Sequence, residues 1–189
     1  IVDVSHVSDQ TFWDIMDETQ KPVFASHSSV RSLSDHPRNM TDRMIRRVAA
    51  DGGAVCINYY SQFIDVAYRD RRRALERTHA ERFDALAERE ARYTDRGTAQ
   101  LALALELDPD IDPPRLDILG NHFEKVVELG GSTAACLGSD FDGISELPLG
   151  MEDVGDLGAL RAELERRGLP IRPIYGENVL RILAAQSGN

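Results

Sequence analysis

Two histidines at matching positions are the first side chains in this sequence that could bind a metal ion. His6 ends the apolar run at residues 2–4 within a Ser-His-Val-Ser motif, and His27 ends the run at 23–25 within Ser-His-Ser-Ser. Neutral imidazole binds zinc well, and two histidines from neighbouring strands supply two of its ligands. For each histidine taken alone, the alternative is a buried residue that only forms hydrogen bonds.

The spacing of the two histidines predicts that they face one site. His27 follows His6 by 21 positions, an interval that suits one strand, one short helix and two tight loops. Short apolar runs bounded by polar residues are typical of buried parallel strands, whose carboxyl ends share one edge of the sheet. That edge is where α/β proteins hold their catalytic groups.

Asp140 follows another apolar run, at residues 134–138. Next to two histidines it would serve as a metal ligand, or as the carboxylate that orients and deprotonates a metal-bound water. Asp142 is two residues further along a strand end, so it is expected to point the other way and to form a turn with Gly143.

Arg38 lies in the loop after the second run, within Asp-His-Pro-Arg-Asn. An arginine at this edge can hold a substrate carboxylate with two parallel hydrogen bonds, although a surface arginine without a function is the alternative. We expect His36 to cap this loop and His122 to pack within a helix.

Apolar periodicity and capping residues predict alternating strands and helices. Strands are expected at 2–4, 23–25, 54–59 and 134–138, and helices at 9–20, 41–50, 116–129, 157–167 and 177–185. Repeated strand-helix units imply right-handed crossovers and a parallel sheet. The predicted fold class is therefore α/β, with about four βα units, which is half of a (β/α)8 TIM barrel.

Residues 65–107 interrupt this rhythm with dense alternating charge, which predicts one long exposed helix or a pair of helices. A solvated face is the simplest role for the segment, and a lid or a homodimer contact is the alternative. Residues 108–114 carry three aspartates but lack the glycine and terminal glutamate of an EF-hand, so they are interpreted as a turn.

Composition excludes several functions. The 189 residues carry a net charge of −10, which argues against a nucleic-acid partner because phosphate binding requires a basic face. Walker A, G-x-G-x-x-G and G-x-S-x-G motifs are absent from the sequence, so neither nucleotide binding nor serine hydrolysis is supported. Cys56 and Cys136 lie in separate apolar runs without C-x-x-C spacing and are expected to be small buried residues, not a disulfide pair.

Several ordered motifs resemble those of the renal (membrane) dipeptidase family. They are residues 3–8 (DVSHVS), 22–29 (PVFASHSS), 36–39 (HPRN), 138–143 (GSDFDG), 150–154 (GMEDV) and 176–181 (GENVLR). The resemblance implies a zinc-dependent barrel that hydrolyses dipeptides at a binuclear site with a bridging water. It implies that His6 and His27 bind the second zinc, that Arg38 receives the dipeptide carboxylate, and that Asp140 handles the proton of the attacking water and of the leaving amine.

The family's remaining metal ligands and a substrate-contacting histidine precede the matched region and are absent from this sequence. We therefore interpret 1–189 as the C-terminal half of one metallo-dipeptidase barrel, with 65–114 as a variable helical insertion and linker. Alone it is expected to be inactive, and with the N-terminal half as partner to hold two zinc ions or other divalent metals. A lactonase or phosphotriesterase type of amidohydrolase, and a non-catalytic barrel remnant that acts as a binding module, are the alternatives. A bacterial cytoplasmic protein is favoured, with export or anchoring left open.

Overall fold

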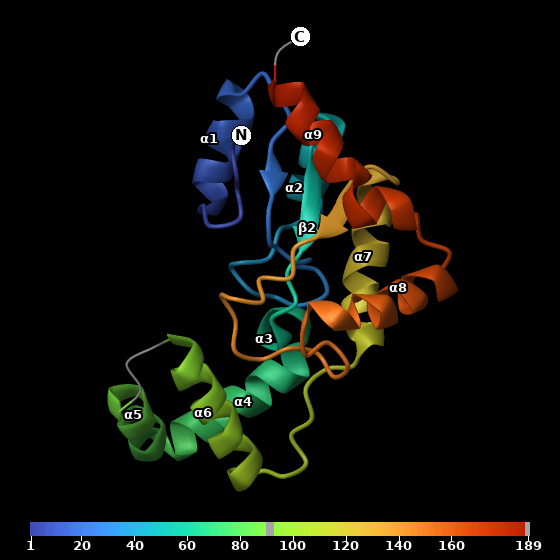
Figure 1. Cartoon of the computed structure of the whole chain (residues 1–189). Coiled ribbons are helices and arrows are strands. Elements are labelled where there is room, and N and C mark those ends of the chain that lie inside the picture. The colour runs from blue at the N-terminus through green and yellow to red at the C-terminus, as the bar shows by residue number, and fades with distance from the viewer. Residues whose placement is uncertain (90–92, 188–189) are drawn as a thin grey trace.

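A three-stranded parallel sheet lies at the centre of the computed structural model, which describes residues 1–89 and 93–187 (Figure 1). The strands are β1 (Phe24–Ala25), β2 (Ala54–Ile57) and β3 (Ala135–Leu137), in the order β1-β2-β3. Phe24 pairs with Ala54, and Val55 pairs with Ala135. All the carboxyl ends of these strands therefore meet at one edge, as the sequence predicts.

The predicted strand at residues 2–4 is only an isolated parallel bridge, between Asp3 and Phe24. Two backbone hydrogen bonds support it, from Val4 N to the Phe24 carbonyl (3.0 Å) and from Phe24 N to the Val2 carbonyl (3.2 Å). The ladder stops at once because the next amide that could extend it, of Ser26, donates to the Asp3 side chain (3.0 Å). Four strands were expected, and three with a bridge at the edge of the sheet are found.

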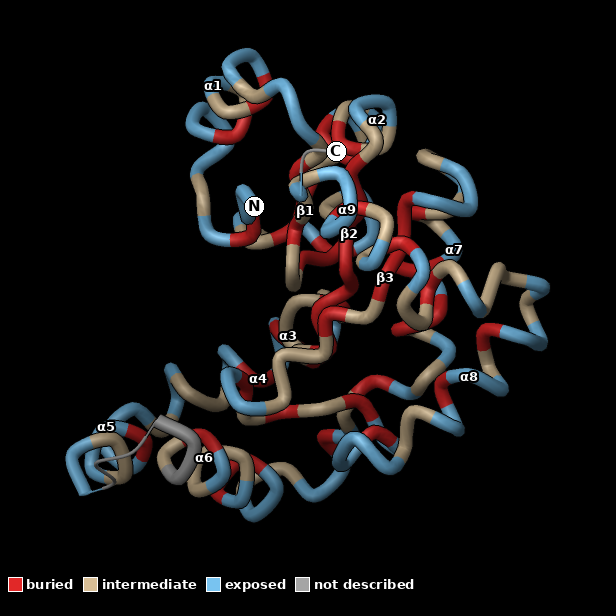
Figure 2. Tube along the Cα trace, turned by 45° about the horizontal axis from the view of Figure 1, so that its top comes forward, coloured by how far each residue is buried: buried red, intermediate tan, exposed pale blue. Residues whose placement is uncertain are grey.

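Three helices cover one face of the sheet. They are α1 (Asp9–Glu18), α2 (Asp42–Ala50) and α7 (Leu116–Gly130), and they form the main core with the alternate residues Val55 and Ile57 of β2. Ser8 caps α1 and Thr41 caps α2. Their side-chain oxygens accept from the amides of Thr11 and Met44 respectively. Figure 2 shows β2 buried along its length, in the middle of the sheet.

The opposite face of the sheet carries a second apolar cluster. Ala54, Cys56 and Cys136 pack there against Ile182 of α9 (Asn178–Gln186). The side chain of Arg181 holds α9 at the amino ends of the strands, because it donates to backbone carbonyls that precede β2 and β3. The short helix η1 (Val154–Asp156), α8 (Leu157–Arg166) and the turn η2 (Pro173–Glu177) complete this part of the chain.

A disulfide joins Cys56 to Cys136, which corrects the expectation of two separate thiols. The parallel register makes the two cysteines direct partners across β2 and β3, with their Cα atoms 4.1 Å apart. Both side chains lie on the same face of the sheet, since partners in register point the same way. The 80 residues between them hide this proximity in the sequence.

The charged segment forms more helices than expected. The structure contains α3 (Ser61–Ile64), α4 (Val66–Thr78), α5 (Ala80–Arg89) and α6 (Tyr93–Leu107). The last three project away from the sheet as a helical arm (Figures 1 and 2), with a small apolar cluster of their own around Phe83, Leu103 and Ala104. This cluster gives the arm an apolar core separate from the main one. Across the described residues, no helix is long and apolar enough to cross a membrane.

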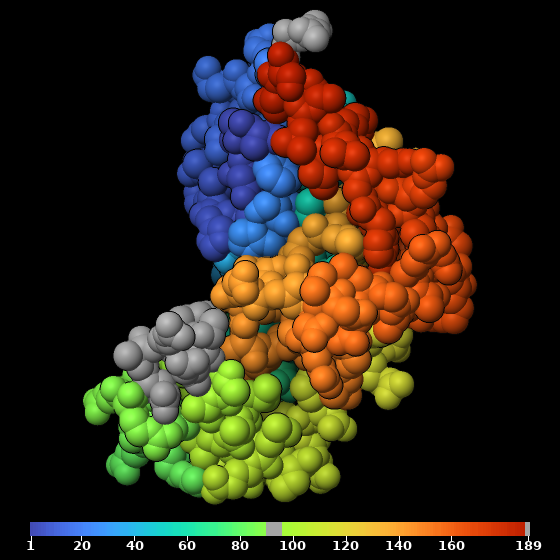
Figure 3. Space-filling view, viewed as in Figure 1, coloured from blue at the N-terminus to red at the C-terminus, as the bar shows by residue number. Residues whose placement is uncertain are grey.

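A buried ion pair ties the arm to the loop after β3. Arg72 of α4 and Glu146 are each 1% exposed, and the guanidinium binds the carboxylate through Nε (3.0 Å) and Nη2 (2.6 Å). Tyr68 and Gln62 donate to the other carboxylate oxygen, at 3.0 and 3.2 Å. These hydrogen bonds satisfy the buried carboxylate, which offsets part of the cost of burying its charge. Figure 3 shows the loop after β3 (orange) filling the space between the sheet and the arm.

His122 of α7 packs within the core, as the sequence predicts, and links two loops. Its Nδ1 accepts from the Val30 amide (3.0 Å), so Nε2 carries the proton and donates to the Ile64 carbonyl (3.0 Å). His122 is only 1% exposed. Burial lowers the pKa of His122 to about 4 from its ordinary value of 6.5.

This buried imidazole predicts a loss of stability in mild acid. The unfolded chain binds a proton at His122 below pH 6.5, whereas the folded chain resists it until about pH 4. The free energy of unfolding is expected to fall by about 3 kcal/mol from this group as the pH drops from 7 to 4. Urea unfolding of the wild type and of His122→Gln across this range measures the difference. Equal pH slopes for the two proteins would contradict the assignment.

Candidate active site

The structure brings the two predicted histidines into direct contact at the carboxyl edge of the sheet. The Nε2 atoms of His6 and His27 are 2.7 Å apart, and the ring centroids are 4.8 Å apart. His6 is exposed and His27 is half-buried. Both rings therefore present the same nitrogen to one point, within hydrogen-bond distance of each other. This convergence is compatible with two ligands of one metal ion.

A chain of hydrogen bonds fixes the protonation of His27. Ser26 Oγ lies 2.6 Å from a carboxylate oxygen of Asp3 and 2.7 Å from His27 Nδ1. The carboxylate only accepts, so the hydroxyl donates to Asp3 and accepts from His27 Nδ1. Nε2 of His27 is thereby left with its lone pair directed at His6. A metal-binding histidine typically donates its other ring N–H to a neighbouring acceptor, as Nδ1 of His27 does here.

Asp3 and Ser26 thus have a role that sequence reasoning missed. The Asp3 carboxylate also accepts from the amides of Ser5 (3.1 Å) and Ser26 (3.0 Å). Burial alone would raise the pKa of Asp3, but the hydrogen bonds from Ser26 and Ser5 outweigh it and hold the pKa below its usual value. Asp3 therefore stays ionised. The signal in the sequence was a carboxylate three residues before His6, inside the otherwise apolar run at 2–4.

The environment also keeps His27 neutral. Burial lowers the pKa of His27, and the positive charge of Arg38 lowers it further, while the negative charge of Asp140 opposes both. Its backbone amide donates to Ser5 Oγ (2.9 Å), which fixes the ring's position on the strand end. A neutral imidazole with a free lone pair is the form that binds a metal ion.

Arg38 reaches the same point from the loop between β1 and α2. Its Nε donates to the Ser5 carbonyl (3.1 Å), and its Nη2 lies 3.2 Å from His6 Nε2. The guanidinium carbon lies 5.6 Å from the centre of the Phe63 ring. His36 caps the loop, as expected, because its Nδ1 accepts from the Arg38 amide (3.1 Å). Burial lowers the pKa of Arg38, but the group keeps its charge.

Asp140 faces this cluster from the end of β3. Its backbone is left-handed (φ 63°), a conformation that aspartate tolerates better than most residues. One carboxylate oxygen accepts from Asn58 Nδ2 (3.0 Å). The charge of Asp140 acts on both His27 and Arg38, which places the three groups in one electrostatic environment.

Asn58 is a second residue that sequence reasoning missed. It is fully buried directly after β2, and its Oδ1 accepts from the Tyr60 amide (2.7 Å), which fixes the side chain. The signal was available, since Asn58 ends an apolar run in the same way as the histidines. Its donor nitrogen orients the Asp140 carboxylate.

The turn after Asp140 leaves no room for another side chain. A Cβ atom at Gly143 would lie 2.2 Å from Asp140 Oδ1, so glycine is needed for the carboxylate to take this position. Asp142 is exposed in the same turn and does not join the cluster. This agrees with the turn predicted for Asp142 and Gly143.

The described residues fit part of a metal centre. His6 and His27 converge as two nitrogen ligands, whereas no group of three His, Cys, Asp or Glu side chains able to hold a metal ion occurs within 1–89 and 93–187. Catalytic zinc commonly has three protein ligands. The pair therefore fits a site to which other chain segments contribute, and the roles assigned to the four predicted residues stay predictions.

Comparison with known proteins places this chain in a family. Residues 1–188 match the family model described as membrane dipeptidase, peptidase family M19. An uncharacterized dipeptidase of Schizosaccharomyces pombe is 30% identical over 186 residues, which are 96% of this chain and 35% of that protein. The chain thus spans about a third of the length of the curated relatives it matches.

Solved structures share the fold. A metallopeptidase from Rhodobacter sphaeroides, solved with a phosphinate mimic of the dipeptide L-Ala-D-Ala, superposes with a TM-score of 0.70 at 21% identity, over 98% of this chain and 42% of that one. The probable dipeptidase PvdM from Pseudomonas aeruginosa gives a TM-score of 0.73 at 22% identity, over 98% of this chain and 50% of that one. These likenesses show the shared fold, and the match of residues 1–188 to the family model establishes that the chain belongs to the membrane dipeptidase family, peptidase family M19.

Proposed function

We propose that this chain supplies half of the active site of a zinc-dependent dipeptidase with a (β/α)8 barrel. The observation that carries the proposal is the convergence of His6 Nε2 and His27 Nε2, 2.7 Å apart, at the carboxyl edge of a parallel sheet. A complementary N-terminal segment would supply the other strands and the remaining ligands. The relatives are longer than this chain, which supports such a segment.

His6 and His27 would hold one of two zinc ions in the complete site. A pair of zinc ions would polarise the scissile carbonyl of the substrate and lower the pKa of a bound water. The hydrogen bond from His27 Nδ1 to Ser26 keeps Nε2 available, and Asp3 secures Ser26. These contacts support the ligand role because they fix the protonation and the orientation of the His27 ring.

Arg38 would bind the carboxylate at the C-terminus of the dipeptide. Its Nε is engaged with the Ser5 carbonyl, while its terminal nitrogens lie beside His6. A substrate carboxylate held there would place the peptide bond next to the metal ligands. Two charge-assisted hydrogen bonds to a planar guanidinium fix orientation as well as position.

Asp140 would act as the general base and then as the general acid. Asn58 holds one carboxylate oxygen, which leaves the other to accept a proton from the attacking water. The same group would pass that proton to the departing amine. The left-handed backbone at Asp140 and the small Gly143 support this orientation.

The rival function is hydrolysis of a lactone or phosphotriester by another amidohydrolase. Arg38 distinguishes the two, because a carboxylate-binding group is useful only for substrates with a free C-terminus. A non-catalytic binding module would have no need for Asn58 to orient Asp140.

The test compares the chain alone with the chain combined with its complementary half, each incubated with zinc. The combined protein is expected to hydrolyse dipeptides such as L-Ala-D-Ala, and the chain alone is expected to show no turnover. Ninhydrin or chromatographic detection of the released amino acids measures the rate. A combined protein that cleaves lactones or phosphotriesters but no dipeptide would overturn the proposal.

A further inference from the structure

An arginine outside the cluster holds the loop that carries Arg38. Arg31 Nε donates to the Asn39 carbonyl (2.7 Å), and its Nη2 lies 3.3 Å from the Pro37 carbonyl. These two carbonyls flank Arg38 on either side. A single guanidinium therefore fixes the backbone both before and after the residue proposed to bind the substrate.

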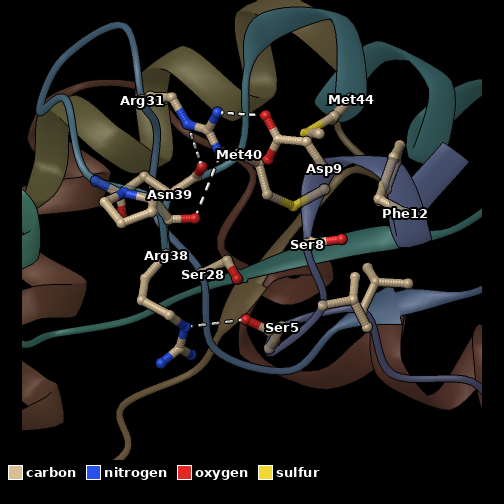
Figure 4. A pocket seen from close by; sticks show the side chains of 13 residues that line it. Ser5, Ser8, Asp9, Phe12, Ser28, Arg31, Arg38, Asn39, Met40 and Met44 are labelled. Carbon is tan, nitrogen blue, oxygen red and sulfur yellow. Dashed lines mark hydrogen bonds and ion pairs between the residues drawn. The ribbon is translucent and has the colours of Figure 1, made fainter.

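The other side of the same guanidinium binds Asp9. Nη1 and Nη2 of Arg31 donate to the two carboxylate oxygens of Asp9, at 2.7 and 2.8 Å. Asp9 is the first residue of α1, whose N-cap Ser8 lies two residues after His6. The ion pair thus connects the loop of Arg38 to the segment that carries His6, as Figure 4 shows.

A small cavity lies beside this loop. It has a volume of about 20 Å³ and lies between the start of α1 and the loop, and its lining includes Arg38, Ser28 and Asn39. Within the described part of the chain, the buried Ser28 Oγ and Asn39 Oδ1 lack a hydrogen-bond partner. The Asn39 side chain is held through Nδ2, which donates to the Ser34 and Phe63 carbonyls (2.7 Å each). The carbonyls on either side of Arg38 are bound by Arg31.

Arg31 itself is firmly anchored. Its amide donates to the Met40 carbonyl (2.8 Å), next to a parallel bridge between Val30 and Met40. The hydrogen bond to Arg31 helps to keep Asp9 ionised, since it holds the pKa of that carboxyl below its usual value. Charge and geometry of the pair are therefore constant over the neutral pH range.

We propose that Arg31 and Asp9 are a positioning pair that sets the place of Arg38, and thereby the affinity of the site for a free C-terminal carboxylate. This inference rests on the proposed function of Arg38. The planar fork of arginine is essential, because it binds two carbonyls and a carboxylate at once. Lysine would keep the charge but cannot make these contacts together.

The test uses the complete enzyme, in which this chain is combined with its complementary half. Arg31→Met and Asp9→Asn are each expected to raise KM for a dipeptide roughly tenfold, with kcat within about twofold of wild type. The zinc content is expected to be unchanged. Asp108→Asn is the matched control, because it breaks a bidentate pair with Arg71 on the arm and should leave KM unaltered.

A double-mutant cycle separates positioning from general destabilisation. In an Arg38→Ala background, Arg31→Met should add less than about a twofold change in KM, because the group it positions is gone. Arg31→Lys, which preserves charge, is expected to show most of the Arg31→Met defect. Additive effects of Arg31→Met and Arg38→Ala, or a KM for Arg31→Met equal to wild type, would overturn the inference.

Amide hydrogen exchange provides a readout that does not depend on activity. The amides of Asn39 and Met40 are hydrogen-bonded, at 2.9 Å each, and Arg31→Met should accelerate their exchange while Asp108→Asn should not. Unaltered exchange in Arg31→Met would refute the role of Arg31 in holding this loop. If the wild-type enzyme fails to cleave any dipeptide while exchange still responds to Arg31→Met, the proposed function fails and the positioning of this loop stands.

Discussion

Asp140→Asn in the complete enzyme is expected to lower kcat for dipeptide hydrolysis by roughly 10²- to 10⁴-fold, because the amide cannot accept the proton of the attacking water. The change conserves the shape of the side chain. The oxygen that accepts from Asn58 Nδ2 can still do so, so the turn after β3 should keep its conformation. KM is expected to change little, since Arg38 rather than Asp140 holds the substrate. Steady-state kinetics with a single dipeptide measure both constants.

Asp142→Asn is the control for this experiment. Asp142 lies in the same turn, two residues away, and is exposed. Removal of its charge should leave kcat within about twofold of wild type, in keeping with an exposed polar side chain outside the cluster. Near-normal turnover by a zinc-loaded Asp140→Asn enzyme would rule out the general-base role.

Arg38→Ala is expected to raise KM for dipeptides by roughly 100-fold, which corresponds to the loss of one or two charge-assisted hydrogen bonds. The guanidinium is half-buried beside His6, so its charge is screened less by solvent than that of an exposed side chain. Hydrolysis of a dipeptide with an amidated C-terminus is the diagnostic comparison. Wild type should handle the amide poorly, and Arg38→Ala should treat the amide and the free acid alike.

Two outcomes of the Arg38 experiment would contradict the proposal. Unchanged KM and kcat for free dipeptides would favour a different amidohydrolase reaction. An equal loss on the free acid and on the amide would indicate that Arg38 only stabilises the loop. Circular dichroism of the variant checks that the fold is intact.

The central part of the site could be predicted from the sequence because it follows from local rules. His6, His27 and Asp140 each end an apolar run, and parallel strands place such residues at one edge. The helices α1 and α2 were located within a few residues because Ser8 and Thr41 are strong N-caps. The positions of these helices and strand ends depend on residues that are close together in the sequence.

What could not be predicted depends on contacts between distant segments. The disulfide between Cys56 and Cys136 requires the register of β2 against β3, which the composition of neither strand reveals. The short bridge at Asp3 results from its own side chain, which accepts the hydrogen bond of the Ser26 amide. The role of Arg31 depends on Asp9, 22 residues earlier in the chain, and on carbonyls exposed by the loop's own conformation.

The metal content of the complete enzyme tests most directly whether His6 and His27 bind zinc in a site that the complementary half completes. Inductively coupled plasma mass spectrometry of wild type is expected to give two zinc ions per site, and His27→Ala is expected to lose about one of them, since zinc with a single remaining histidine from this chain falls short of its usual ligand number. The variant should be folded, because His27 is only half-buried. Two zinc ions retained in both His6→Ala and His27→Ala, or no zinc in wild type, would contradict a metal site built on these histidines.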